Sequence, residues 1–106
     1  MQEVTDRYIG KEYLQHNSTV ADGGQAFVDA FAPFLKQNPQ SRASVKRVMA
    51  DGDLVALHVH SQLSPDDAGE AVVDIFRFDN EGKIVEHWDV IQAVPKEKSA
   101  SGRGMF

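Results

Sequence analysis

The chain has no cysteine among its 106 residues. This absence excludes disulfides, thiol nucleophiles and cysteine metal sites, and it leaves the redox compartment undecided. No apolar run approaches the roughly 20 residues that a membrane helix requires, and no basic and apolar leader precedes the first helix-like segment. We therefore expect a soluble protein that has no membrane contact and is cytoplasmic if its source is bacterial.

Positive charge is also scarce. Eleven Lys and Arg residues face sixteen Asp and Glu residues, which gives a net charge of −5. The basic residues are scattered, so a surface that follows nucleic-acid phosphates is not expected. The sequence lacks a phosphate-binding glycine-rich loop, a Gly-x-Ser-x-Gly elbow and a helical His-Glu-x-x-His motif, which argues against phosphoryl transfer and serine hydrolysis.

What is present fits one domain over residues 1–106, since the chain is 42% hydrophobic and long enough to form a core. Val4, Tyr8 and Ile9 stand at helical spacing and predict a short helix within residues 2–13, with Gly10 as its stop signal. A polar loop should follow from Leu14.

A second helix is predicted from Asp22 to about Gln37. Asp22 is a candidate N-cap, with Gln25 three residues later in a weak capping box, and Pro33 should kink the helix or end its regular part. Asn38-Pro39 should finish it. Its buried stripe consists of Phe27, Phe31, Phe34 and Leu35.

From Ser44 onward the hydrophobic period changes to two, and polar turns divide the chain into four strands. Short connections favour an antiparallel meander, so we predict one curved sheet with no parallel pairs and the second helix across its concave face. The fold class is α+β. The tail over residues 95–106 should be largely irregular, with Met105-Phe106 able to occupy a groove. The predicted strands cover about 44–50, 54–63, 71–78 and 83–94.

The most informative motif is His87-Trp88-Asp89, inside a segment that otherwise has the pattern of a buried strand. Side chains alternate along a strand, so His87 and Asp89 share one face and Trp88 lies on the other. Burying ionisable groups costs free energy unless they are partnered, which favours a strand lining a functional cavity. A lone tryptophan is typical of a core or an interface.

Asp74 lies in a similar apolar strand and shares its face with Phe76 and Phe78. A carboxylate desolvated there could serve as a general acid or base. The alternative is an ordinary ion pair with Arg77 or with a nearby histidine. By strand alternation, Arg77 lies on the opposite face.

Two further histidine motifs allow alternatives. His58 and His60 project to one face of a strand and could bind zinc if His16, His87 or a carboxylate completed the site, but an exposed or interface pair is the simpler interpretation, and we expect no tightly bound metal. His16-Asn17 precedes the second helix, where Asn17 could act as a cap or join the polar residues of a site.

Segments distributed over nearly the whole chain resemble the SnoaL-like polyketide-cyclase branch of the nuclear-transport-factor-two-like superfamily, and specifically a subgroup labelled as predicted aldol-condensation catalysts. The last strand is the most specific of them. The matching segments are Tyr13–Asn17, Asp22-Gly23, Asp51–Val55, Val73–Arg77, Gly82–Gln92 and Gly104–Phe106.

The resemblance implies a conical pocket formed by a curved sheet and closed by helices, a homodimer through the outer sheet face, and acid–base chemistry without a cofactor. Members of this family carry a further helix before the Tyr8-Ile9 segment, and without it the cone would be partly uncovered. We expect a small apolar carbonyl compound as the ligand or substrate. The expected catalytic residues are Asp89, Asp74, His87 and His16, and the expected ligand contacts are Asn17, His60, Phe76, Trp88 and Phe31.

In the enzymatic hypothesis, Asp89 or Asp74 removes a proton beside a carbonyl group. His16, His87 or Asn17 then polarises the oxygen. The rival hypothesis is a non-catalytic ligand-binding or dimerisation domain of the same fold, because a fold does not settle chemistry.

Overall fold

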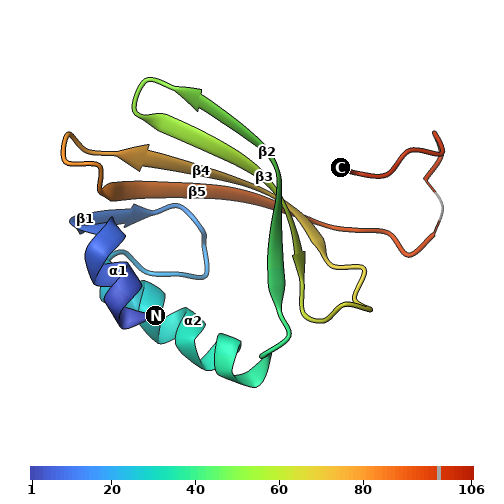
Figure 1. The fold of residues 1–106 in the computed structure, drawn as a ribbon, viewed down its shortest axis with the longest axis horizontal. Coiled ribbons are helices and arrows are strands. Elements are labelled where there is room, and N and C mark those ends of the chain that lie inside the picture. The colour runs from blue at the N-terminus through green and yellow to red at the C-terminus, as the bar shows by residue number, and fades with distance from the viewer. Residues whose placement is uncertain (98) are drawn as a thin grey trace.

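The computed structural model describes residues 1–97 and 99–106; residue 98, which belongs to the tail predicted to be irregular, lies outside the described residues. Two helices and five strands make an α+β fold (Figure 1). Within the described residues, no helix is long and apolar enough to cross a membrane. The elements are α1 (Gln2–Tyr8), β1 (Ile9–Gln15), α2 (Gly24–Gln37), β2 (Arg42–Asp51), β3 (Leu54–Gln62), β4 (Glu70–Phe78) and β5 (Ile84–Ala93).

The five strands form one curved sheet in the order β1-β5-β4-β3-β2 (Figure 1). Strands β2 to β5 form the predicted antiparallel meander. The expectation of no parallel pairs is wrong, because β1 is a fifth strand that runs parallel to β5 at the sheet edge. This pairing joins segments far apart in the sequence, so no short turn between them could predict it.

Strand β1 occupies residues that were predicted to be helix and loop. The predicted short helix is present but ends at Tyr8, and it does not bury its apolar residues, since Val4 is 60% exposed. Gly10 is not a helix stop but a point of close approach, because a Cβ there would lie 2.9 Å from Cγ1 of Val85 on β5. The absent side chain lets the two strands come together.

Helix α2 also departs from expectation at both ends. Asp22 does not cap it: Gly23 is the N-cap residue, and Asp22 Oδ1 accepts a hydrogen bond from the Gln15 backbone N–H. Pro33 does not end the helix, which continues to Gln37. Because this part of the helix is exposed, the carbonyl that Pro33 leaves without a donor can reach water. Asn38 closes the helix as predicted, with its backbone and side-chain nitrogens both donating to the Phe34 carbonyl.

Helix α2 lies on the concave side of the sheet near the β1 edge and packs against β1 and α1 (Figure 1). The expectation that it lies across the concave face is therefore met only at the β1 edge, and within the described part of the chain the helix does not pack along the other strands. Tyr13 contacts Phe27 edge-on, with 6.3 Å between the ring centroids. The buried hydrophobic core is small and consists of Tyr13, Val28, Val59, Val72 and Val85.

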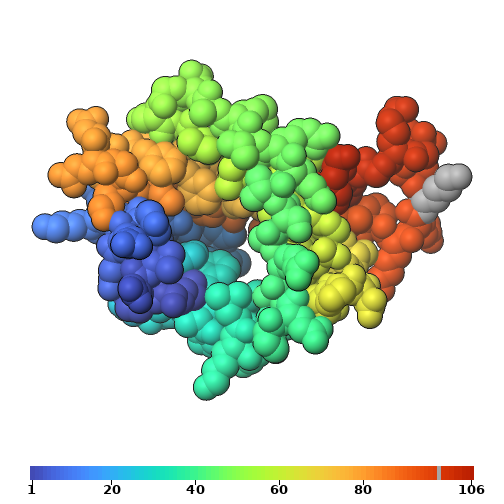
Figure 2. Space-filling view, in the orientation of Figure 1, coloured from blue at the N-terminus to red at the C-terminus, as the bar shows by residue number. Residues whose placement is uncertain are grey.

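The molecule exposes more surface than a compact chain of its size. A folded monomer of 11.7 kDa has about 5,900 Å² of accessible surface. This chain has 7586 Å². The space-filling view shows an opening between α2 and the concave side of the sheet (Figure 2). Apolar side chains on both sheet faces therefore remain uncovered.

Candidate active site

Two carboxylates and an imidazole meet on the concave face. Asp74 of β4 stands directly opposite Asp89 of β5 in the antiparallel ladder, and paired residues in such a ladder point to the same side. His87 Nε2 lies 2.8 Å from Asp74 Oδ1. One ligand atom from each of these three residues lies within 4.8 Å of the others, so the cluster could also hold a cation. Alternation along β4 and β5 places these groups together as expected.

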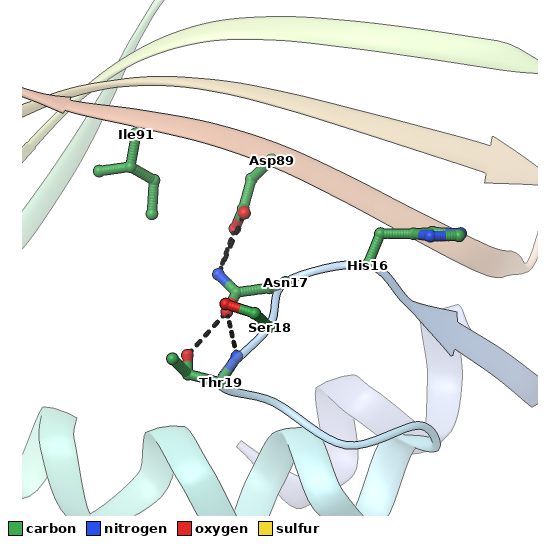
Figure 3. Close-up of a pocket in the computed structure, with 6 residues that line it drawn as sticks. All are labelled: His16, Asn17, Ser18, Thr19, Asp89 and Ile91. Carbon is green, nitrogen blue, oxygen red and sulfur yellow. Dashed lines mark hydrogen bonds between the residues drawn. The ribbon is translucent and has the colours of Figure 1, made fainter.

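Asn17 fixes the second carboxylate. Its Nδ2 donates to both oxygens of Asp89, at 3.0 and 2.9 Å. Its own Oδ1 accepts from the backbone N–H and the hydroxyl of Thr19, at 2.9 and 2.7 Å, which sets the orientation of the amide (Figure 3). The side chain of Asn17 therefore has both expected kinds of contact: Oδ1 caps the local turn at Thr19, and Nδ2 holds Asp89, while the residue does not cap α2.

His87 is enclosed by side chains from the two neighbouring strands, β1 and β4. Its Nδ1 lies 2.8 Å from Oε1 of Gln15 on β1. Its ring stacks on Phe76 of β4, at a centroid distance of 4.8 Å, and lies parallel to the ring of Tyr13 at 6.5 Å. His87 is only 8% exposed. It therefore reaches the cavity mainly through Asp74.

Tyr13 lies deep beneath the site. Burial raises the pKa of the Tyr13 phenol to about 12, and the negative charges of Asp74 and Asp89 act in the same direction. A hydrogen bond with Gln15 acts in the opposite direction. The phenol therefore stays neutral at physiological pH and is not a source of phenolate.

The imidazole of His16 is turned away from the other predicted catalytic residues. Its ring lies flat on Trp88, 4.8 Å between centroids, and its Nε2 is 2.7 Å from Glu86 Oε2. Arg77 donates to the other oxygen of Glu86, also at 2.7 Å. The hydrogen bonds from His16 and Arg77 hold the pKa of the Glu86 carboxyl below its usual range. In Figure 3 the imidazole points away from Asp89.

Three of the expected ligand contacts are also not brought to this cluster. His60 and Trp88 belong to the convex face, since each alternates with the concave positions of its strand. His60 Nε2 lies 2.8 Å from the Ala68 carbonyl, and its ring packs at a tilt against Phe106, which also contacts the ring of His58. Phe31 packs against Phe27 on α2. Phe76 is brought to the cluster, through its stacking on His87.

An open cleft of about 330 Å³ lies beside Asp89, between β5 and the loop that follows β1 (Figure 3). This volume is at the low end of the range for small-molecule sites. The cleft offers polar groups on one side and the side chain of Ile91 on the other. Its lining residues are His16, Asn17, Ser18, Thr19, Asp89 and Ile91.

Tyr13 and Gln15 contact the site but were not among the residues predicted for it. Both come from β1, and they stand two residues apart, which is the spacing of a shared strand face. That spacing was the available signal. It was obscured because the segment was assigned to a helix and a loop.

Residues 2–99 match the family model described as SnoaL-like polyketide cyclase. The chain belongs to this family. A comparison with curated proteins finds no match for the chain.

Several solved structures share the fold of this chain at low sequence identity. A provisionally assigned isomerase of the SnoaL-like family from Agrobacterium tumefaciens is 14% identical, with a TM-score of 0.70 over 86% of this chain and 80% of that one. A SnoaL-like polyketide cyclase from the same organism is 11% identical, with a TM-score of 0.69 over 86% and 78%. TsrD from Streptomyces laurentii is 18% identical, with a TM-score of 0.68 over 86% and 75%. These similarities establish the fold, while the chemistry has to be argued from the site.

Proposed function

We propose that this SnoaL-like protein catalyses aldol condensation, cyclisation or isomerisation of a small, mainly apolar carbonyl compound by acid–base chemistry without a cofactor. The observation that carries the proposal is the pairing of two differently held carboxylates on one concave face. Asp89 is bound by an amide, and Asp74 by an imidazole. Two carboxyl groups in different environments are the usual basis for separate acid and base roles.

Asp89 is the general base in this proposal. It borders the cleft, and Asn17 holds both of its oxygens, so its position is defined before a substrate enters. The carboxylate removes a proton from the carbon beside the carbonyl group. The electron pair of that C–H bond forms the carbon–carbon double bond of an enolate, and negative charge develops on the carbonyl oxygen.

The Asp74–His87 pair is the proton donor to that oxygen. His87 Nε2 and Asp74 Oδ1 are 2.8 Å apart and can share a proton next to the developing charge. In an aldol reaction the enol carbon then attacks a second carbonyl carbon. The first carbonyl group reforms as its proton returns to the Asp74–His87 pair, and the new alkoxide takes up the proton that Asp89 removed. His16 has no part in this scheme, because its imidazole is engaged with Glu86.

Exchange of α-protons tests the proposal without knowledge of the natural substrate. Apolar cyclic ketones and β-diketones are incubated with the protein in D₂O, and deuterium uptake is followed by NMR. We expect Asp89→Asn to lower the exchange rate by roughly 10²- to 10⁴-fold. The matched control is Asp66→Asn on an exposed turn, which should leave the rate unchanged.

The Tm separates chemistry from folding in this experiment. Asp89→Asn should change the Tm little or raise it, because a partly buried charge is lost. Full activity of Asp89→Asn would refute the assignment of the base. Binding of the same ketones without exchange above the buffer rate would favour the second candidate, a ligand-binding domain, which the small and open cleft also accommodates.

A homodimer through the convex sheet face is the proposed assembly. This face carries exposed apolar side chains that alternate with the site residues, among them Met49, Val73 and Val90. The chain also exposes about 1,700 Å² more surface than expected for its mass. That excess is ample for a standard interface, which covers about 800 Å² on each partner.

A further inference from the structure

The side chain of Gln15 joins two parts of the site. Its Oε1 lies 2.8 Å from His87 Nδ1 and accepts a hydrogen bond from the Asn17 backbone N–H at 3.1 Å. The strand pairing explains this position, because Gln15 stands beside His87 in the parallel β1–β5 ladder. The bond from the Gln15 backbone N–H to Asp22 Oδ1, at 2.8 Å, further restrains the residue.

The Asn17 bond determines which way the Gln15 amide faces. A backbone N–H can only donate, so the atom that it meets has to be the amide oxygen and not the amide nitrogen. The same oxygen then faces His87 Nδ1. An oxygen acceptor can bind Nδ1 only when this nitrogen carries a hydrogen. The backbone of Asn17 thus sets the tautomer of His87 through Gln15.

The other ring nitrogen of His87, Nε2, can still exchange a proton. With a hydrogen fixed on Nδ1, the only ring nitrogen able to gain or lose a proton is Nε2, which faces Asp74 Oδ1 at 2.8 Å. The ring is 8% exposed and stacked on Phe76. Solvent therefore does not readily reach its nitrogens, and the ring does not readily flip to interchange them.

We propose that Gln15 is a positioning residue that holds a hydrogen on His87 Nδ1 and so directs all proton exchange of this histidine to Nε2 and Asp74. Its importance for turnover rests on the proposed function, whereas the tautomer itself does not. Gln15 touches no reacting atom in this scheme. It acts through His87.

The test is the tautomeric state of His87, measured by long-range ¹H–¹⁵N correlation NMR on protein labelled with ¹⁵N-histidine. The His87→Phe spectrum identifies the signals. In the wild type we expect Nδ1 to stay protonated across the titration while Nε2 alone changes with pH. In Gln15→Met, the ratio of Nδ1–H to Nε2–H tautomer should fall by about tenfold, as expected for the loss of one hydrogen bond.

Two comparison variants isolate the acceptor. Gln15→Glu keeps an oxygen acceptor and should retain the hydrogen on Nδ1. Gln92→Met makes the same change as Gln15→Met at an exposed position on the other face of β5, and it should leave the His87 spectrum unchanged.

A wild-type His87 that is neutral with its hydrogen on Nε2 would overturn the proposal, and so would an unchanged tautomer ratio in Gln15→Met. If Gln15→Met does not fold, the wild-type and Gln15→Glu spectra still decide the question. Deuterium exchange distinguishes this inference from the proposed function. If the tautomer of His87 depends on Gln15 but no ketone exchanges deuterium, the inference about Gln15 stands and the enzymatic role is refuted. If ketones exchange deuterium but the tautomer does not depend on Gln15, the enzymatic role stands and the inference is refuted.

Discussion

The hydrogen bond between Asp74 and His87 should contribute measurably to stability, because both side chains are largely withdrawn from water. The side chain of His87 is 10% exposed and that of Asp74 is 21% exposed, with 2.8 Å between Nε2 and Oδ1. Hydrogen bonds to charged groups contribute about 1.5–3 kcal/mol in such settings. A double-mutant cycle with Asp74→Leu and His87→Phe should therefore give a coupling free energy in this range. The Phe side chain retains the aromatic packing of the histidine.

The assay is urea unfolding at pH 7 and a fixed protein concentration, so that any association is held constant. The matched control is the cycle of His16→Phe and Glu86→Met. That pair has an equally short contact of 2.7 Å, but the His16 side chain is 45% exposed, so its coupling energy should be clearly smaller. A coupling below about 0.5 kcal/mol for Asp74–His87, or one no larger than the control, would refute the argument that burial strengthens this bond.

Three further predictions follow from other parts of the fold. The pKa of the Tyr13 phenol rises to about 12 on folding, so the unfolded chain ionises first as pH rises. The protein should therefore lose about 2–3 kcal/mol of stability between pH 10 and pH 12. Alkaline unfolding of Tyr13→Phe should lack this loss, whereas the control Tyr8→Phe, at an exposed position, should retain it. Gly69→Ala should lower the free energy of unfolding in urea by about 3 kcal/mol or more. The reason is that φ is +77° at Gly69 and the new Cβ would lie 2.2 Å from the Ser61 carbonyl oxygen. A Tm equal to that of the control Gly104→Ala would contradict this prediction. Val90→Lys on the convex face should give a monomer by light scattering at micromolar concentration, whereas Val45→Lys on the concave face should not, and a wild-type monomer would exclude the dimer.

The sequence determined the four antiparallel strands and the face shared by the two carboxylates. Side chains alternate at every residue of a strand, and short turns force neighbouring strands to pair antiparallel. Asp74 and Asp89 could therefore be assigned to one face from strand alternation together with the family resemblance. The end of α2 at Asn38 was equally local, because the proline that follows prevents the helix from continuing.

Only the tertiary structure decided the role of β1 and the surroundings of His87. The parallel β1–β5 pair joins segments about 70 residues apart and is irregular between Ile9 and Leu14, so no local pattern fixes its register. That register brings Gln15 to His87 and sends His16 to Glu86 on the other face. The direction of a loop residue depends on how distant strands pair, and this is why the surroundings of His16 could not be derived from local spacing whereas the strand face of Asp89 could.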